Sequence, residues 1–96
     1  MILTAIFDLK TNTFFNYFFV ENIEDIKRIY EREFLTDSNA FFVKYPQDFD
    51  LYELGSIDNH SGIFEAKKEL VNHFIELKEV AERYDRESNE KRNDRD

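Results

Sequence analysis

The sequence predicts a single α+β domain, in which a small antiparallel β-sheet packs against one helix and an amphipathic helix follows at the C-terminal end. Runs of apolar and aromatic residues, typical of strands, occupy the N-terminal region and the middle of the chain. Apolar residues spaced three and four positions apart, typical of helices, follow each of these regions. A chain of 96 residues can bury one modest hydrophobic core, so we expect one domain.

The predicted sheet has five segments. They lie near residues 1–9, 13–20, 40–44, 49–57 and 62–65. The first segment is apolar on both of its alternating faces, so we expect it to be a central strand. The residues after it fit a hairpin turn, in which Asn12 is the best suited to left-handed geometry.

The second segment contains Phe14–Val20, the densest aromatic run in the chain. Neither of its alternating faces is polar, and three interpretations are open. The run is a buried strand, or it is an aromatic surface that a partner binds. The third interpretation is a stacking platform for single-stranded nucleic acid, which needs neighbouring cations that this run lacks.

The first predicted helix spans Ile23–Leu35. Asn22 is a good N-cap residue, and two acidic residues in the first turn suit the positive end of the helix dipole. Apolar residues then recur at helical spacing along one face, and Ile29 widens this stripe. We expect the stripe to pack on one face of the sheet.

The stretch Tyr45–Glu65 organises the chain, because it contains the only proline and both glycines. Pro46 disfavours helical geometry at the preceding residue, and Asp48 favours a turn. A strand of aromatic and aliphatic residues follows. The polar segment Asp58–Gly62 then has the composition of a hairpin loop, where Gly62 can adopt a positive φ.

The second helix is predicted over residues 66–84, which completes a domain of residues 1–84. Five of its residues follow the spacing of a short coiled-coil seam: Leu70, Phe74, Leu77, Ala81 and Tyr84. This face either docks on the sheet or pairs with another protein or a second copy, as in a homodimer. Residues 85–96 contain no apolar residue and alternate in charge, so we expect a frayed helix end or a disordered tail. The expected core residues are Phe7, Phe18, Ile26, Tyr30, Phe34, Phe42, Leu51 and Leu54.

Charge and composition argue against several classes of protein. The net charge of −8 opposes contact with phosphate backbones and anionic membrane surfaces. No apolar run approaches the ~18 residues of a membrane span, and the N-terminus lacks the pattern of a signal peptide. Cysteine is absent, so the fold depends on packing without disulfides, which suits a reducing cytosol.

Catalytic and cofactor-binding motifs are also absent. No phosphate-binding glycine loop occurs, and the spacing of residues predicts no catalytic triad. The chain has two histidines, His60 and His73. A metal site needs three or four converging ligands, whereas His73 with Glu69 would supply two. We therefore expect no enzymatic activity, no cofactor and no metal.

The best candidate for a nucleic-acid patch combines aromatic rings with lysines: Lys10, Phe41, Phe42, Lys44 and Tyr45. Rings beside cations are the usual platform for single-stranded nucleic acid. The alternative interpretation is a core strand with a solvated lysine. The negative net charge favours this alternative.

The segment Lys44–Glu65 resembles the signature region of the small non-structural protein of gokushoviruses, which are single-stranded DNA phages of the family Microviridae. The matching residues form a Pro-x-Asp-Phe turn, a Leu-Tyr-Glu-Leu-Gly strand and a loop that closes on glycine. They are Pro46, Asp48, Phe49, Leu51, Tyr52, Glu53, Leu54, Gly55, Asp58, Gly62 and Phe64. Looser patterning extends the resemblance over residues 1–65, but Asn16 and Tyr17 stand where members of this family often have prolines.

The resemblance implies a non-structural protein made during infection, in the cytoplasm of the host cell. Proteins of this family are usually assigned to the switch from duplex replication to single-strand synthesis and packaging. The resemblance therefore implies partners among the replication or packaging proteins of the phage or its host. Direct binding of single-stranded DNA is the alternative, and the acidic composition of this chain disfavours it.

Overall fold

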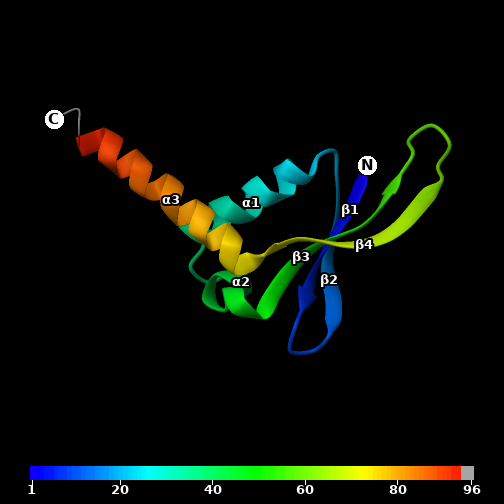
Figure 1. Ribbon diagram of the computed structural model, residues 1–96, viewed down its shortest axis with the longest axis horizontal. Helices are drawn as coiled ribbons and strands as arrows, with labels where there is room; N and C mark the ends of the chain where they lie inside the picture. The colour runs from blue at the N-terminus through cyan, green and yellow to red at the C-terminus, as the bar shows by residue number, and fades with distance from the viewer. Residues whose placement is uncertain (94–96) are drawn as a thin grey trace.

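The computed structural model describes residues 1–93, and it describes side chains for residues 1–87. The sheet consists of β1 (Ile2–Asp8), β2 (Thr13–Val20), β3 (Phe49–Ile57) and β4 (Phe64–His73). The helices are α1 (Ile23–Thr36), α2 (Phe41–Lys44) and α3 (Phe74–Asn93), with a 3-10 turn, η1, at Pro46–Asp48. All strand pairs are antiparallel, which confirms the predicted α+β class (Figure 1).

The strand order in the sheet is β2-β1-β3-β4, so β1 is a central strand, as the sequence predicts. Ala5 and Ile6 are completely buried in it. At its end, the Asp8 carboxylate accepts a hydrogen bond from the backbone N–H of Lys10, at 2.9 Å. Asn12 adopts the expected left-handed geometry, with φ of 59°. These local contacts fix the β1–β2 turn and therefore the register of the two strands.

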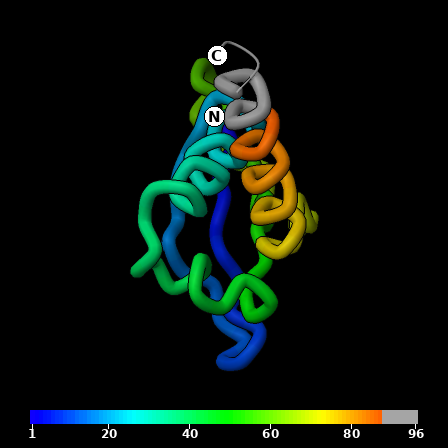
Figure 2. Tube along the Cα trace, turned by 90° about the vertical axis from the view of Figure 1, so that its left-hand side faces the viewer, coloured from blue at the N-terminus to red at the C-terminus, as the bar shows by residue number. Residues whose placement is uncertain are grey.

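The helices cover one face of the sheet, and the hydrophobic core lies between them. Ile6 and Leu51 point from the sheet into this core, where they meet Ile26, Phe42 and Phe74 from the helices. Figure 2 shows α1 and α3 side by side in front of the strands. Burial of these aromatic and aliphatic side chains is the main source of stability in a chain without disulfides.

The α1 helix matches its prediction closely. Asn22 occupies the N-cap position, although its side chain makes no capping hydrogen bond. Its carbonyl oxygen instead accepts a hydrogen bond from the backbone N–H of Asp25, at 3.1 Å. Ile26 and Tyr30 bury the predicted stripe in the core.

Residues 40–44 form the short helix α2 and its N-cap, so the predicted strand there is wrong. The reason is aromatic packing. A helical turn places the ring of Phe42 between helices α1 and α3, with centroids 5.2 Å from Tyr30 and 4.9 Å from Phe74. This burial outweighs the preference of aromatic residues for strands. Tyr45 has non-helical geometry before Pro46, so α2 ends after one turn.

Residues 66–73 belong to strand β4, so the predicted helical start at residue 66 is also wrong. The strand pairs with β3 over most of its length, for example Tyr52 with Leu70 and Gly55 with Ala66. The sequence favoured a helix because the apolar residues from Leu70 onward follow a helical spacing. The charged residues before Leu70, such as Lys67 and Lys68, suit an exposed edge strand, where charges oppose pairing with another sheet.

The α3 helix therefore begins at Phe74, and it continues to Asn93. The Glu76 carboxylate accepts a hydrogen bond from the backbone N–H of His73, at 2.7 Å, which satisfies one free donor at the start of the helix. No helix end occurs at Tyr84, so residues 85–93 of the predicted tail are helical, and residues 94–96 lie outside the described part.

Half of the predicted core residues are fully buried: Ile26, Tyr30, Phe42 and Leu51. Phe34 packs against the core and is partly buried, as are Phe7 and Leu54. Phe7 faces the side of the sheet opposite the helices, where it contacts Phe14 and Tyr52. Phe18 is 51% exposed, so its predicted burial is wrong. It lies on the edge strand β2, where no further strand covers it.

Candidate functional site: an apolar groove beside strand β2

A groove of about 480 Å³ separates strand β2 from helices α1 and α2. The strand contributes Phe18 and Phe19, α1 contributes Ile29 and Glu33, and Asp37 lies in the segment between the two helices. We call this surface the β2–α1 groove. Its volume falls within the ~300–1,000 Å³ of typical ligand sites.

The apolar side chains that face the β2–α1 groove are accessible. Phe18 and Ile29 are each about half exposed, at 51% and 48%. Strand β2 contains no charged residue, although it forms an edge of the sheet. Edge strands normally carry charges or prolines that prevent pairing with other chains. This surface therefore has the character of an interaction site, which is one of the interpretations that the aromatic run allows.

Strand β2 also contains a local irregularity. Asn16 has a φ of 53°, and the pairing register with β1 shifts between Thr4 and Ile6. The extra residue lets the strand change direction, and bulges of this kind often re-aim side chains near functional sites. Side chains alternate between the two faces of the strand after the bulge. Phe18 lies on the same face as the buried Val20 and therefore faces the groove, whereas the Phe19 side chain points to the opposite face of the sheet.

Two carboxylates lie at the α2 side of the groove. Glu33 is in the last turn of α1, and Asp37 is the C-cap residue of that helix. Burial raises the pKa of the Glu33 carboxyl above its usual value, and the charge of Asp37 raises this pKa further. Within the described residues neither side chain forms an ion pair. No lysine or arginine lines the groove.

The predicted coiled-coil seam is divided between the core and the surface. Phe74, Leu77 and Ala81 are buried within the domain, at 1% exposure or less. Leu70 lies on strand β4 rather than on the helix, and Tyr84 is 61% exposed on α3. A continuous helical seam from Leu70 to Tyr84 is therefore wrong, because its first residue is in a strand. The three buried residues attach α3 to the rest of the domain.

The residues of the predicted nucleic-acid patch are only partly brought together. The Lys10 ammonium lies 5.9 Å from the centre of the Tyr45 ring, and it also pairs with the Asp48 carboxylate at 3.2 Å. Lys44 is exposed, whereas Phe42 is only 2% exposed. Phe41 packs against Phe15 and Phe49 at centroid distances of 5.1 and 4.8 Å. The rings of Phe41 and Phe42 therefore pack inside the domain, whereas the Tyr45 ring is exposed.

The family model described as Phage ORF5 protein matches residues 1–80 of the chain. The chain belongs to the phage ORF5 protein family. The match covers the whole sheet, α1, α2 and the start of α3, so it extends beyond the region of resemblance noted in the sequence. It also includes every residue that defines the β2–α1 groove. No curated protein and no solved structure matches the chain.

Within this family match, the signature segment builds the turns that hold the sheet together. Pro46 is buried in η1, and the Asp48 carbonyl oxygen accepts a hydrogen bond from the Leu9 backbone N–H at 3.0 Å. The Asp58 carboxylate accepts hydrogen bonds from the backbone N–H groups of His60 and Ser61, which lower the pKa of Asp58. These contacts give the segment a structural role in the fold.

The strand residues of the signature also have structural roles. Phe49 and Leu51 are buried in the core, and Leu54 is partly buried at a bulge against β1. Glu53 forms an ion pair with Lys67 of the neighbouring strand. Gly55 pairs with Ala66 of β4, and the Phe64 ring and the Glu65 carbonyl oxygen occupy the space that a side chain at Gly55 would need.

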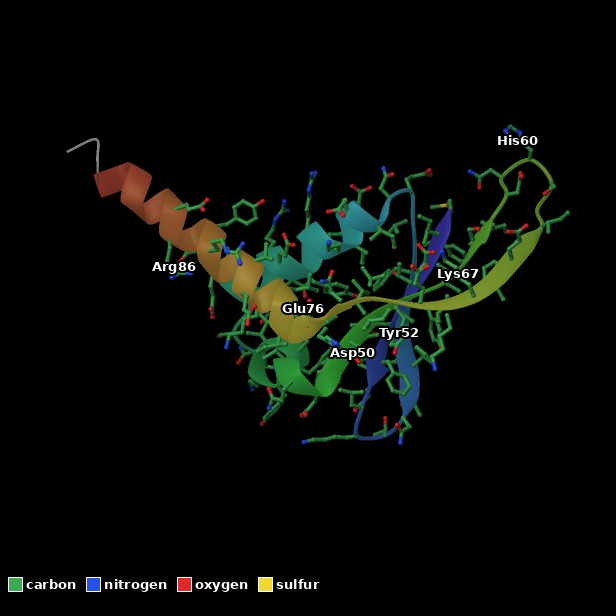
Figure 3. All side chains as sticks on the ribbon, in the orientation of Figure 1. Asp50, Tyr52, His60, Lys67, Glu76 and Arg86 are labelled. Carbon is green, nitrogen blue, oxygen red and sulfur yellow. The ribbon has the colours of Figure 1, made fainter. Side chains whose placement is uncertain are left out.

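The face of the sheet opposite the helices carries two contacts that the sequence did not predict. The Lys68 ammonium lies 5.7–5.8 Å from the ring centres of Phe7, Phe14 and Tyr52. Nearby, the buried Asp50 carboxylate is 2.7 Å from Nδ1 of His73, at the junction of β4 and α3. Figure 3 shows Asp50 and Tyr52 on strand β3. Both contacts depend on the pairing of β3 with β4, which a predicted helix at residue 66 does not allow.

The Asp50–His73 contact predicts a pH-dependent stability. The hydrogen bond to Asp50 raises the pKa of His73, burial offsets part of this rise, and the charges of Asp50 and Glu76 add to it. The folded pKa thus exceeds the unfolded value of about 6.5, so protonated His73 stabilises the fold fully below pH ~6.5. This contribution is lost as the pH rises through the folded pKa. Since His73 is half exposed, we expect it to be below about 1 kcal/mol.

Urea unfolding between pH 6 and pH 8 measures this effect. The free energy of unfolding should fall across the interval in the wild-type chain and in His60→Gln, which changes the histidine at the tip of the β3–β4 hairpin (Figure 3). His73→Gln should remove the step. A step of equal size in His73→Gln would show that another group causes it.

Metal binding and membrane insertion receive no support from the described residues. Among the side chains that the structure describes, those of residues 1–87, no cluster of three or more histidine, aspartate or glutamate residues is placed to hold a metal ion. Across residues 1–93, no helix has both the length and the apolar character needed to cross a membrane.

No direct signal in the sequence marks this groove as a site. Sequence patterns identify Ile29 only as a residue that widens the apolar stripe of α1, and they do not single out Glu33 and Asp37. An indirect indication in the sequence is the combination of the uncharged aromatic strand β2 with the helix α1, whose last turn lacks basic residues.

Proposed function

We propose that this protein is a non-enzymatic, non-structural protein of a gokushovirus-type phage, and that it acts in the cytoplasm of the host during viral DNA replication or packaging. In this role it promotes the switch to single-stranded DNA synthesis by binding a replication or packaging protein. Membership of the phage ORF5 protein family supports the viral origin. The signature at Lys44–Glu65 supports the assignment to gokushoviruses.

The β2–α1 groove is the observation that carries the proposal of a protein partner. It is apolar and accessible, and it lies beside an uncharged edge strand. Exposed apolar patches of this kind mark protein interaction sites. The negative net charge supports a protein partner over a nucleic acid, because an acidic chain is repelled by phosphate.

Co-purification from infected cells tests this function. A tagged chain should recover a phage or host replication protein, such as the replication-initiation protein, or a packaging protein. The recovery should be unchanged after nuclease treatment, since the proposed contact is between proteins. Recovery of viral DNA alone, or loss of the partner with nuclease, would contradict the proposal.

Direct binding of single-stranded DNA is the alternative, and the contact between Lys10 and Tyr45 is the observation that favours it. We expect no measurable binding, with a dissociation constant weaker than roughly 10⁻⁴ M for a ~30-nucleotide oligomer at physiological salt. Lys10 is already paired with Asp48, and Phe42 is buried. Fluorescence anisotropy over a salt series measures this. Micromolar binding that weakens with salt, and that is lost in Lys44→Glu, would support the alternative.

Self-association is a separate proposal. Leu70 and Tyr84 are the exposed members of the predicted seam, so a homodimer through this region would have to use them. Light scattering on the full chain and on Tyr84→Ser measures the mass in solution. A dimer that dissociates in the variant would support association through α3, and a wild-type monomer at micromolar concentration would reject it.

A further inference from the structure

We propose that the β2–α1 groove binds a short segment of a partner protein in which apolar side chains are followed by an arginine or lysine. The inference rests on the proposed function, which supplies a protein partner, and it specifies the chemistry of the segment that is recognised. The apolar side chains would cover Phe18 and Ile29. The cation would lie between the carboxylates of Glu33 and Asp37.

The apolar part of the segment follows from the accessible surface of the groove. Phe18 and Ile29 keep about half of their surface in contact with water. A large apolar side chain contributes roughly 150–250 Å², so these two residues expose on the order of 200 Å². This area suits a few side chains of a short segment, whereas a stable interface between folded proteins buries about 800 Å² on each partner.

The cation follows from three unfavourable features at the α2 side of the groove. Glu33 and Asp37 are like charges four positions apart, a spacing that brings side chains together on a helix. Both lie at the C-terminal end of α1, where the helix dipole is negative and the last turn has no basic residue. Glu33 is also partly buried. A cation from the partner would relieve all three features at once.

Charge also decides against a second copy as the occupant. Each chain carries a net charge of −8, so two copies repel one another. Strand β2 is uncharged, so it offers no lysine or arginine to the carboxylates of a second groove. Phosphate groups would meet the same acidic residues, which excludes a nucleic acid here. A basic protein segment is the occupant that complements the groove in both charge and polarity.

Selection from a random peptide library tests the proposal, because it does not require an identified partner. Peptides roughly 12 residues long are displayed and selected against the immobilised full chain. We expect enrichment of sequences with two or three apolar residues next to an arginine or lysine. Enrichment of acidic or uncharged sequences would overturn the proposal, as would a selection that yields no binder.

Variants of the chain then locate the binding site of the best peptide, with its affinity measured by titration calorimetry. Ile29→Ser should weaken binding about tenfold, because it removes an exposed apolar contact. The control Ile63→Ser changes a residue that is 64% exposed outside the groove, and it should bind as the wild type does. Equal affinity for both variants would overturn the assignment to the groove.

The cation is tested from both sides of the contact. Glu33→Gln combined with Asp37→Asn should weaken binding about tenfold and remove most of its salt dependence. The control Glu79→Gln changes an exposed carboxylate on α3 and should have no effect. A peptide with citrulline in place of its arginine keeps the shape of the side chain but loses its charge. The affinity of this peptide for the wild-type chain should equal the affinity of the original peptide for the double variant. A citrulline peptide of unchanged affinity would overturn the role of the cation.

Three further outcomes identify the occupant of the groove and separate this inference from the function on which it rests. If a dimer forms in solution and Ile29→Ser dissociates it, the groove binds a second copy and the inference is wrong. If Ile29→Ser still recovers the replication or packaging partner from infected cells, the function stands and the groove is not its site. If the peptide binds as expected but no such partner is recovered, the inference stands and the proposed function fails.

Discussion

Phe74→Ala should lower the free energy of unfolding by about 3–5 kcal/mol, the usual cost of removing a buried phenylalanine ring. Phe74 is completely buried, and its ring centre lies 5.1 Å from that of Tyr30 and 4.9 Å from that of Phe42. It therefore joins helices α1, α2 and α3. Because domains of this size are stable by only about 5–15 kcal/mol, the variant should be close to unfolding.

Urea unfolding followed by circular dichroism measures this loss, with Tyr84→Ala as the control. Tyr84 is an aromatic residue on the same helix, but it is 61% exposed. Its replacement should cost less than about 1 kcal/mol, since little packing is removed. A loss below about 1 kcal/mol in Phe74→Ala would mean that α3 does not complete the core.

Gly55→Ala should be the second most damaging change, with an expected loss of about 2–5 kcal/mol from backbone strain and overpacking combined. Gly55 has a φ of +148°, which side chains rarely adopt. A methyl group there would collide with the carbonyl oxygen of Glu65 and the ring of Phe64 on the paired strand. The change therefore strains β3 and separates it from β4.

Gly62→Ala is the matched control for Gly55→Ala. Gly62 also has a positive φ, of +74°, but a methyl group there would meet open space. Its expected cost is about 1–2 kcal/mol, from backbone geometry alone. Thermal or urea unfolding of both variants separates the two effects. Equal losses would show that the close approach of the two strands contributes nothing beyond strain.

Strand β1, the turn that follows it and helix α1 were predictable because residues close together in the sequence determine their structure. Continuous apolar residues made β1 a central strand, and Asn12 fitted the turn that follows. The α1 helix has a clear N-cap position and an apolar stripe, so its prediction was accurate within one residue at either end. In these elements the periodicity of the sequence and the burial in the core agree.

The later elements depend on contacts that are distant in the sequence. Whether residues 66–73 form a helix or a strand is decided by their pairing with β3, and this pairing leaves no periodic signal in a charged segment. Residues 40–44 are helical because Phe42 packs against α1 and α3. The apolar spacing from Leu70 to Tyr84 resembles a helical seam, but Leu70 belongs to strand β4, which ends at His73. The helix α3 begins at the next residue, so only the later residues of the spacing share a helix.

The candidate site was only partly predictable, for a related reason. The aromatic run of β2 indicated a partner surface as one interpretation, but its location at an edge of the sheet required the strand order. The proximity of Glu33 and Asp37 to Phe18 depends on how α1 packs beside β2. Sequence patterns identify the apolar residues, whereas the groove that they form follows from tertiary structure.

If the protein acts in viral replication by binding a partner through the β2–α1 groove, a change in the groove should alter viral DNA synthesis. The most direct measurement is the ratio of single-stranded to duplex viral DNA in cells infected with phage that carries Ile29→Ser or the control Ile63→Ser. We expect Ile29→Ser to reduce the single-stranded fraction while the folded protein is still produced, and Ile63→Ser to match the wild type. A single-stranded fraction that is unchanged in Ile29→Ser would contradict this role of the groove.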